Sequence, residues 1–549
     1  MKNIRLYLVF ALMIIIAGVA SFRLFDIQIS SFGEWKSQAQ GQQIFFQQTK
    51  GERGEIYMQN MKGDTVPLAV NNRVYNAYIS PRETEDKSVS VDIAEALGLN
   101  KEFVEERMER NSSYEVLKRR IAEKDAKELV EVEGLYLEEE IIRYYPQGRL
   151  ASHVLGFLGG EGVGQYGVEQ YYENIIGGKE GIREGRKGSN GFFTTRDTTE
   201  KGLNIVLTID YNIQHFAEKL LIEAYEEFDM VEGSILVGDP HTGKILALAN
   251  NPGFNPNHYS EVENTRVFRN QVVQDFFEPG SIFKPITMAM ALDALVVDVD
   301  DTYDDKGSIK IHGRTIYNYG RRAWGEVTMT EILEKSINTG IVSVSDRLGK
   351  DLFLEYMENF GFFEKTGVDL HGEVASRNEN ILEMHDVNFA TASYGHGIQV
   401  TTMQMFRAFS VLANGGKMIT PHIVTGMGEE IGERIISHTA VSQLTDMLVS
   451  VVGSGSGWRA GVPGYYVAGK TGTAQIPWSV LGVSKSGYSN ETIQSFVGYA
   501  PAYDPQFVII VLLDRPNTVT SELSAAPIFG ELARYMLNYM QIPHDYNEE

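Results

Sequence analysis

The feature that most limits what this chain can fold into is an uncharged, apolar run near its N-terminus, residues 6–22. A run of about 17 residues is at the short end of the length that a helix needs to cross a membrane. Lys2 and Arg5 precede the run, so the N-terminus is expected in the cytoplasm and the rest of the chain outside. A cleaved signal peptide, cut after residues 18–20, is the alternative. The run is longer than usual for one, and residues 23–25 continue the helix. We therefore predict a retained single-pass membrane anchor.

The chain after the anchor has the composition of a globular protein with more than one domain. Its 549 residues predict two or three domains, and 43% hydrophobic residues supply ample material for a core. The net charge of −24 argues against a nucleic-acid-binding protein, which would carry a basic face. The absence of cysteine excludes thiol nucleophiles, disulfides and cysteine metal sites, and it is compatible with an oxidising compartment.

The region from about residue 35 to 200 is predicted to mix short strands and helices. Residues 53–57 are typical of a turn that enters a strand, and we expect short helices over residues 91–99, 101–108 and 124–130. The charge on the last of these helices is interpreted as a solvated face. Residues 185–199 are rich in Gly, Ser and Thr, which predicts a linker.

From about residue 203 the pattern is strands, then helices, then strands. Two apolar strands, residues 233–238 and 244–249, are joined by a tight turn and predict a hairpin. Other strands are expected at residues 205–209, 465–468, 495–499 and 507–513, and helices at 213–225, 281–295 and 527–540. This order is typical of an antiparallel sheet with helices packed on it, an α+β fold.

The first candidate for chemistry is the stretch of residues 278–284. Pro279-Gly280 marks a turn, and the apolar residues 281–295 after it predict a buried helix. Ser281 would begin the helix, with Lys284 one turn later on the same face. A neutral lysine there could take the proton that makes the serine hydroxyl a nucleophile. Ser-x-x-Lys also arises by chance, and an N-cap serine with a solvated lysine is the simpler interpretation.

Two further polar clusters follow in the same domain. Ser336-Ile337-Asn338 interrupts a helical region between residues 328 and 348, where an ordinary helix end would look the same. Lys470-Thr471-Gly472-Thr473 follows the predicted strand at 465–468. Residues 464–471 also fit the nucleotide-binding pattern G-x-x-x-x-G-K-[ST]. The middle of that segment is strand material and Pro477 argues against a following helix, so we reject a P-loop.

In this order, Ser-x-x-Lys, Ser-x-Asn and Lys-Thr-Gly form a known signature of the penicillin-interacting serine enzymes. The resemblance extends over nearly the whole chain, including the anchor. The chain is similar to class B penicillin-binding proteins at residues 53–56, 143–146, 153–157, 164–169, 207–210 and 239–246. Residues 278–281 and 495–500 resemble the division-type (FtsI-like) branch more than the elongation branch. The chain departs from the family at Ile282, where Thr is usual, and at residues 58–61 in the N-terminal module.

The resemblance implies the domain organisation. Residues 1–23 would be the cytoplasmic tip and transmembrane helix, and residues 24–200 an elongated mixed α/β pedestal. Residues 201–549 would form a transpeptidase domain, a five-stranded antiparallel sheet packed between helices. The pedestal resembles a non-catalytic module, so no glycosyltransferase activity is expected. A membrane-embedded SEDS-type (FtsW/RodA-like) glycosyltransferase is the implied partner, contacted through the anchor and the pedestal.

The resemblance also implies a mechanism. Ser281 would attack a peptidoglycan stem peptide that ends in D-Ala-D-Ala, release D-alanine, and pass the acyl group to an amine of a neighbouring stem peptide. Lys284 would be the base, which requires burial or a second cation, Lys470, to lower its pKa from about 10.4. Ser336 would relay a proton, and Asn338 would hold the substrate amide and Lys284. The substrate carboxylate would be bound by the remaining motif residues: Thr471, Gly472 and Thr473. β-Lactams would acylate Ser281, and no metal or organic cofactor is required.

Other functions remain open at this point. An elongation-type class B transpeptidase differs only in the residues around the motifs. A serine β-lactamase shares the three motifs but would hydrolyse its acyl-enzyme quickly, and a large N-terminal module fits it poorly. A β-lactam-sensing protein would keep the pocket as a binding module. The acyl-acceptor residue and the oligomeric state are not given by the sequence.

Overall fold

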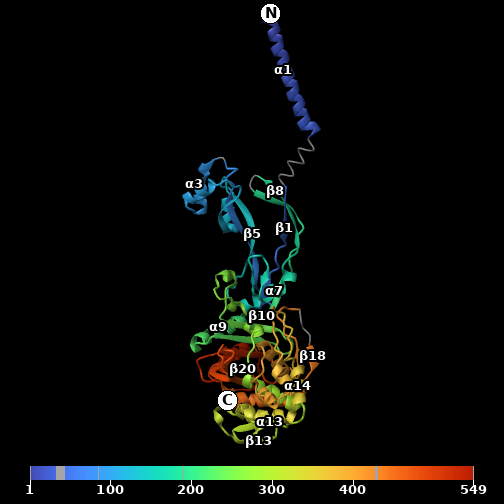
Figure 1. Ribbon diagram of the computed structural model, residues 1–549, viewed down its shortest axis with the longest axis vertical. Coiled ribbons are helices and arrows are strands. Elements are labelled where there is room, and N and C mark those ends of the chain that lie inside the picture. The colour runs from blue at the N-terminus through green and yellow to red at the C-terminus, as the bar shows by residue number, and fades with distance from the viewer. Residues whose placement is uncertain (1, 32–43, 85, 189–190, 427–430, 548–549) are drawn as a thin grey trace. The chain divides into compact units, whose positions relative to one another are not determined.

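The structure is a computed structural model that describes residues 2–31, 44–84, 86–188, 191–426 and 431–547 (Figure 1). The described chain forms two compact units. The first consists of residues 1–54, 71–143 and 177–203, and the second of residues 55–70, 144–176 and 204–549. The predicted catalytic motifs all lie in the second unit, so the first is described only briefly.

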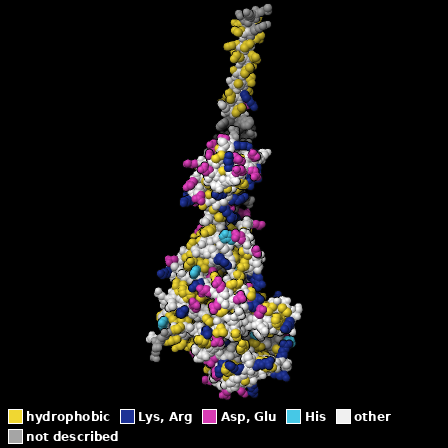
Figure 2. Space-filling model, turned by 90° about the vertical axis from the view of Figure 1, so that its left-hand side faces the viewer, with side chains coloured by type: hydrophobic (Ala, Val, Ile, Leu, Met, Phe, Trp, Pro, Cys, Tyr) yellow, Lys and Arg dark blue, Asp and Glu magenta, His cyan; other side chains and the backbone are white. Residues whose placement is uncertain are grey.

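The N-terminal helix is where the sequence predicts it. Helix α1 (Lys2–Phe25) continues into a short π-helical segment, Asp26–Ser30. Residues 6–30 are long and apolar enough to cross a membrane. Hydrophobic side chains cover the surface of this helix in Figure 2, whereas acidic and basic side chains are mixed over the rest of that face. This helix makes the protein a membrane-anchored one.

The first unit is built from short helices and strands around a small core. Helices α3 (Ser90–Leu97) and α4 (Lys101–Met108) confirm two predictions, and Asn100 caps the second by accepting a hydrogen bond from the Glu102 amide at 3.1 Å. The other elements are β1 (Ile44–Lys50), β3 (Thr65–Ile79, shared with the second unit), β4 (Glu115–Ala122), α5 (Glu123–Leu129), β5 (Tyr136–Tyr144), β8 (Glu180–Gly188) and β9 (Gly191–Asp197).

The predicted linker at residues 185–199 is wrong. Most of it belongs to the antiparallel hairpin of β8 and β9, and β8 also pairs with β1. The glycine-rich composition that suggested a linker is compatible with strands because backbone hydrogen bonds hold β9 to β8, and β8 in turn to β1. Tertiary pairing thus overrides the local preference of the sequence.

The second unit contains the predicted five-stranded antiparallel sheet. Its strand order is β12-β11-β21-β20-β19. The strands are β11 (Glu232–Gly238), β12 (Ile245–Asn251), β19 (Ala468–Pro477), β20 (Tyr488–Ala500) and β21 (Phe507–Asp514). The predicted hairpin of β11 and β12 is confirmed, with Ile235 opposite Ala249.

Helices cover both faces of this sheet, and the strand residues alternate between two cores. One core contains Ile235, Ile509 and Val511 with residues of α9 (Tyr211–Phe228) and α19 (Ala525–Tyr539). The other contains the alternate residues, such as Leu236 and Ile510. It includes residues of α11 (Lys284–Asp293), α17 (Thr402–Ala413) and α18 (His438–Gly453). Because both faces are buried, β21 and the middle parts of β11 and β12 are apolar without alternation, whereas β19 and β20 also carry polar residues.

Two predicted boundaries shift in a way that matters for the site. The strand expected at residues 465–468 begins only at Ala468, because Gly464 (φ +81°) forms a turn before it. The Lys-Thr-Gly motif therefore lies within the strand and not after it. The helix expected from Ser281 begins with a 3-10 turn, Gly280–Phe283, and becomes α-helical at Lys284. Pro285, which has no N–H, occupies the first turn of α11, where the loss costs least.

The remaining elements of the second unit surround the sheet and carry the other motifs. They are β2 (Ile56–Gln59), α6 (Ser152–Leu155), β6 (Phe157–Leu158), β7 (Gly164–Gln165), α7 (Gly167–Tyr171), α8 (Glu173–Ile176), β10 (Ile205–Asp210), α10 (Gln271–Gln274), β13 (Thr302–Asp305), β14 (Ser308–Ile311), β15 (Arg314–Tyr317), β16 (Gly325–Thr328), α12 (Met329–Glu334), α13 (Asn338–Leu348), α14 (Lys350–Asn359), α15 (Glu379–Leu382), α16 (Asp386–Ala392), β17 (Lys417–Ile419) and β18 (Ile431–Arg434).

Candidate active site

The Ser281 turn is held in place by two glycines. Gly280 adopts φ +57°, and its amide donates a hydrogen bond to the Gly395 carbonyl at 3.0 Å. A Cβ on Gly395 would lie 2.2 Å from the Gly280 oxygen, so no larger residue fits there. Gly280, Ile282 and Phe283 are buried, and Ser281 is the one residue of this turn that is partly exposed. The turn thus presents the serine at the surface of the core.

Lys284 lies one turn below Ser281 and is fully buried. Its Nζ atom is 2.6 Å from the Ser336 carbonyl oxygen, 2.7 Å from Asn338 Oδ1 and 3.1 Å from Ser336 Oγ. The structure therefore brings the first two motifs together, as the sequence predicts. Burial, and to a smaller extent the charge of Lys470, holds the pKa of Lys284 well below its ordinary value.

These three contacts suit a neutral lysine. A neutral amine has two N–H bonds and one lone pair, and the two carbonyl-type oxygens of Ser336 and Asn338 use both N–H bonds. The lone pair is then left for a hydroxyl proton. This geometry is compatible with the predicted role of Lys284 as a general base, which must accept a proton from a hydroxyl.

Ser336 occupies a strained backbone position between helices α12 and α13. Its φ is +52°, in the left-handed region that residues with a side chain seldom adopt. The following residue, Ile337, is fully buried and fixes the connection in the core. This bend directs both the carbonyl and the hydroxyl of Ser336 at Lys284. Such a strained residue persists only where its surroundings hold it, and it is typical of functional sites.

The third motif lies on β19, the last strand of its sheet. Lys470 is fully buried, and burial lowers its pKa to about 7. Its Nζ is 3.2 Å from both the carbonyl oxygen and the hydroxyl of Thr471. The hydroxyl of Thr471 is 3.1 Å from Ser456 Oγ, and that of Thr473 is 3.1 Å from Ser521 Oγ. Sequence reasoning missed both serines, because only the fold brings them to the strand.

Gly472 allows β19 to lie against the Ser281 turn. A Cβ on Gly472 would be 2.5 Å from Ser495 Oγ, 2.9 Å from the side chain of Ile282 and 3.3 Å from the Pro279 carbonyl oxygen. The first and third motifs are therefore in direct contact. Since β19 pairs with β20 on one side only, its other edge can receive an extended peptide.

A second group beside the turn was not predicted. The Tyr488 hydroxyl donates to Glu278 Oε2 at 3.0 Å, and the His396 ring lies 5.2 Å from the rings of both Tyr488 and Tyr394. Burial raises the pKa of Glu278 to about 6. Burial, with a contribution from the Lys284 charge, lowers the pKa of His396 to about 4. The one sequence signal was the position of Glu278 directly before the turn.

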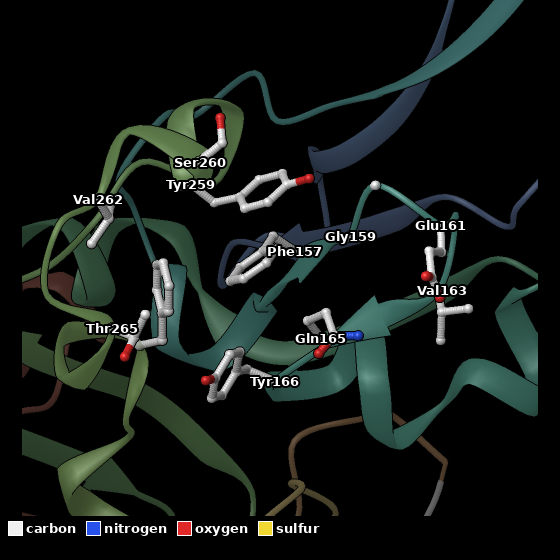
Figure 3. A pocket seen from close by; sticks show the side chains of 12 residues that line it. Phe157, Gly159, Glu161, Val163, Gln165, Tyr166, Tyr259, Ser260, Val262 and Thr265 are labelled. Atoms are coloured by element: carbon white, nitrogen blue, oxygen red, sulfur yellow. The ribbon is translucent and has the colours of Figure 1, made fainter.

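One cavity lies elsewhere in the second unit. It has a volume of about 450 Å³ and lies beside β6, β7 and the 3-10 turns of residues 256–268 (Figure 3). Aromatic side chains dominate its lining, among them Phe157, Tyr166 and Tyr259. None of the predicted site residues lines this cavity. This cavity therefore does not mark the position of the predicted site residues.

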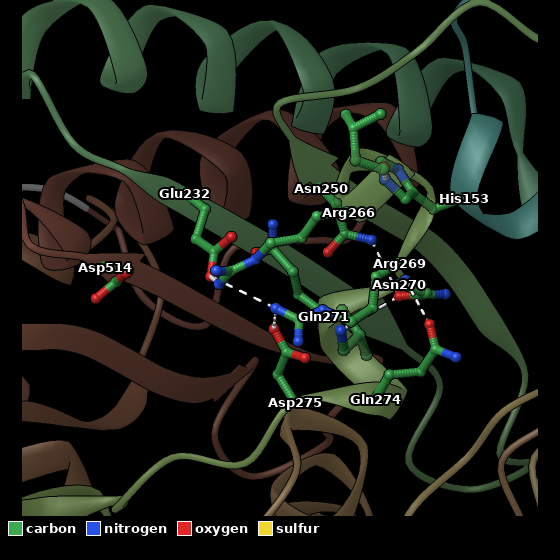
Figure 4. Close-up of polar contacts among 12 residues, drawn as sticks. His153, Glu232, Asn250, Arg266, Arg269, Asn270, Gln271, Gln274, Asp275 and Asp514 are labelled. Carbon is green, nitrogen blue, oxygen red and sulfur yellow. Dashed lines mark hydrogen bonds and ion pairs between the residues drawn. The ribbon is translucent and has the colours of Figure 1, made fainter. Parts of the chain in front are cut away.

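A network of ion pairs near the start of β11 is also separate from the motifs (Figure 4). Arg269 pairs with Asp275 at 2.8 Å, and Arg266 pairs with Glu232 at 3.1 Å. Burial raises the pKa of Asp275 to about 6. We interpret this network as structural, because it ties the segment before α10 to the sheet.

Comparisons with known proteins agree with the geometry. Residues 233–534 match the family model for the penicillin-binding protein transpeptidase domain, and residues 48–207 match the penicillin-binding protein dimerisation domain. Stage V sporulation protein D of Bacillus subtilis is 34% identical over 88% of this chain and 77% of its own length. The probable peptidoglycan D,D-transpeptidase PbpC of Pseudomonas aeruginosa is 30% identical over 99% of this chain and 96% of its own length.

The solved structures give the same fold. Penicillin-binding protein 2X from Streptococcus thermophilus superposes with a TM-score of 0.78 and 22% identity, covering 90% of this chain and 80% of that one.

Peptidoglycan D,D-transpeptidase FtsI of Escherichia coli is a further relative in sequence, 29% identical over 87% of this chain and 83% of its own length. The similarity thus spans the N-terminal region as well as the motif-bearing domain.

Proposed function

The chain belongs to the class B penicillin-binding proteins, and we propose that it is a peptidoglycan D,D-transpeptidase acting through a Ser281 acyl-enzyme. The observation that carries this proposal is the fully buried Lys284, whose Nζ lies 2.6 Å from the Ser336 carbonyl oxygen, 2.7 Å from Asn338 Oδ1 and 3.1 Å from Ser336 Oγ. A buried, neutral lysine one turn from a partly exposed serine is the arrangement that activates a serine nucleophile. β-Lactams acylate the same serine, since their amide resembles the acyl-D-Ala-D-Ala end.

In the acylation step the Ser281 hydroxyl oxygen bonds to the carbonyl carbon of the penultimate D-alanine, and its proton moves to Lys284. The peptide C–N bond then breaks, and the leaving amine takes a proton that Lys284 supplies through the Ser336 hydroxyl. D-Alanine departs, and an ester joins Ser281 to the donor peptide. In the second step an amine of another stem peptide attacks the ester, its proton returns along the same route, and Ser281 regains its hydroxyl.

The remaining motif residues bind and polarise the substrate. We assign the terminal carboxylate to Thr471 and Thr473, with Lys470 supplying positive charge when protonated and Gly472 letting the strand lie close. The tetrahedral oxyanion accepts hydrogen bonds from the backbone N–H groups of Ser281 and Thr473. Loss of one such donor typically costs about 2.7–4 kcal/mol in the barrier. Asn338 holds the substrate amide as well as Lys284.

A transfer assay separates this function from hydrolysis. The full-length chain in detergent is given a thioester analogue of the acyl-D-Ala-D-Ala end and a D-amino acid as acceptor. We expect the amide transfer product to exceed the hydrolysed acid, and Ser281→Ala to form neither. A product that is nearly all acid would identify a β-lactamase-like hydrolase. Stable binding of β-lactam without either product would favour a sensing protein.

We place the chain in the division-type branch, acting at the septum. The support is the resemblance around residues 278–281 and 495–500 and the FtsI name among the relatives. The elongation-type branch is the alternative. Depletion of the protein in its own cells distinguishes the two, because loss of a division enzyme gives filaments, whereas loss of an elongation enzyme gives rounded cells.

We also propose how the parts of the chain divide the work. Residues 1–23 anchor the protein as a single pass, residues 24–200 form a non-catalytic pedestal, and residues 201–549 form the extracytoplasmic transpeptidase domain. The matches to two separate family domains support this division. A membrane-embedded SEDS-type glycosyltransferase supplies the glycan strands and contacts the anchor and the pedestal. If exchanging residues 6–22 for an unrelated membrane helix leaves partner co-purification unchanged, the anchor is not part of that contact.

A further inference from the structure

The segment that connects α11 to α12 contains a buried carboxylate. Asp305, at the end of β13, is only 2% exposed. Its oxygens accept hydrogen bonds from the Gly307 amide at 3.0 Å, Asn318 Nδ2 at 2.8 and 2.9 Å, the Trp324 amide at 3.0 Å and the Thr339 hydroxyl at 2.6 Å. A buried charge with this many donors is fully satisfied and holds its neighbours in one arrangement.

Two of these donors come from different elements and also contact each other. The Thr339 amide donates to Asn318 Oδ1 at 3.0 Å, and both residues are buried. Asn318 follows β15, whereas Thr339 lies in the first turn of α13. Asp305 therefore joins the β15 end to the start of the helix that carries the Ser-x-Asn motif.

The residues just before these two anchors form the contact that matters for the site. Tyr317 precedes Asn318, and Asn338 precedes Thr339. The side-chain amide nitrogen of Asn338 donates to the Tyr317 carbonyl oxygen at 3.0 Å, and its Oδ1 is 2.7 Å from Lys284 Nζ. The hydrogen bond between Asn338 and Tyr317 orients the Asn338 amide. Each of these two residues directly precedes a residue, Thr339 or Asn318, whose side chain is hydrogen-bonded to Asp305.

The orientation of that amide decides whether Lys284 can act as a base. With Oδ1 toward Lys284, the amide accepts an N–H and leaves the amine lone pair open. A flipped amide would present N–H groups to Lys284, and one of them would occupy the lone pair. Because the Tyr317 carbonyl can only accept, it forces the amide nitrogen to its own side and the oxygen toward Lys284.

We propose that Asp305 is a positioning residue for the transpeptidase reaction, which acts through Asn318 and Thr339 to hold the Asn338 amide in the orientation that keeps Lys284 a base. This inference rests on the proposed function, in which Lys284 deprotonates Ser281. It assigns a role in the reaction to a residue outside the three motifs. Asp305 touches neither the substrate nor the reacting atoms.

The test measures the rate at which a fluorescent penicillin acylates the full-length chain in detergent, as a function of penicillin concentration. The saturation curve gives two constants, the non-covalent affinity and the acylation rate constant. The variants are Asp305→Asn, Thr339→Val, which removes only the hydroxyl donor, and Thr339→Ser, which keeps it. We expect the first two to lower the acylation rate constant at least about tenfold, since general-base catalysis contributes about 100-fold or more. Their non-covalent affinity should change by less than about threefold, and Thr339→Ser should stay close to wild type.

Asp369 offers a matched control. It is also a buried carboxylate (7% exposed) that accepts from the Tyr172 hydroxyl and the Ile423 amide, both at 2.6 Å. Asp369→Asn should lower thermal stability without slowing acylation. If Asp369→Asn slows acylation as much as Asp305→Asn does, or if Thr339→Val acylates like wild type, the positioning role is overturned. Thr339→Val keeps the test decisive even if Asp305→Asn does not fold. A wild type that is never acylated would overturn the proposed function itself, and this inference with it.

Discussion

Two single residues of the site, the buried lysines Lys284 and Lys470, are expected to lower the free energy of unfolding because of the positions that their proposed roles require. Each is fully buried, and among the described residues no carboxylate is hydrogen-bonded to either lysine. Burying an uncompensated ammonium is costly, and the group loses its proton more readily instead. In the proposed mechanism that penalty makes Lys284 a base at neutral pH, and it predicts that replacing a buried lysine by an apolar residue stabilises the fold.

We predict that Lys470→Met makes the protein more stable near pH 7 while it abolishes acylation. The pKa of Lys470 is lowered to about 7 in the folded state, against about 10.4 for an unfolded lysine. Between these values the unfolded chain binds more protons, so the wild-type free energy of unfolding rises with pH, and the full penalty applies below pH 7. The stabilisation should be roughly 1–4 kcal/mol at pH 7 and should shrink toward pH 10.

Denaturant unfolding at pH 7 and pH 9.5 measures this effect. Lys219→Met serves as the control, because Lys219 is half exposed on α9 and contacts Glu223 on the surface. That control should change the free energy of unfolding by less than about 1 kcal/mol at either pH. A Lys470→Met variant that is less stable than wild type at pH 7 would show that Lys470 is not penalised by its burial.

At the scale of elements, the site depends on how closely β19 approaches the turn that carries Ser281. Gly472 permits this approach, because its missing Cβ would meet Ser495, Ile282 and the Pro279 carbonyl within 3.3 Å. Packing therefore sets the separation between the edge of β19, the proposed substrate-binding strand, and Ser281, the proposed nucleophile. A small displacement between them has a large cost in rate.

We predict that Gly472→Ala slows acylation of the full chain by about 100-fold, because a displacement near 1 Å can cost that much. The added methyl should also lower the free energy of unfolding by about 1–3 kcal/mol through overpacking. Gly453→Ala is the matched control, since a Cβ there meets nothing within 4 Å. Acylation by fluorescent penicillin checks the rate, and equal rates for both alanine variants would refute the close-packing argument.

The sequence predicts most elements of the sheet and the three motifs, because apolar strands and ordered motifs are local signals. It places the strand at residues 465–468, whereas β19 begins at Ala468, because the turn at Gly464 delays the start of strand pairing. It misses β8 and β9, because β8 also pairs with β1, which is distant in the chain, and such a non-local contact leaves no local signal in the sequence. Glu278 and Asp305 are missed for the same reason: their partners are distant in the chain.

At the scale of the whole molecule, the account requires one membrane crossing with the catalytic domain outside. The chain contains no cysteine, so a single introduced cysteine is its one thiol. We predict that a membrane-impermeant maleimide labels Leu295→Cys on intact cells stripped of any outer barrier, since Leu295 is 88% exposed. Asn3→Cys, before the apolar run, should be labelled only after the membrane is permeabilised. Labelling of both positions in intact cells would contradict the single-pass topology.

The central claim is that Ser281 is a nucleophile that forms a stable acyl-enzyme, and intact mass measurement tests it most directly. The full-length chain in detergent, wild type and Ser281→Ala side by side, is incubated with benzylpenicillin and its mass is recorded. We predict one stable adduct per wild-type chain and none on the variant. Rapid loss of the drug without an adduct would show a β-lactamase instead. A folded wild type that gives neither an adduct nor drug turnover would contradict the account.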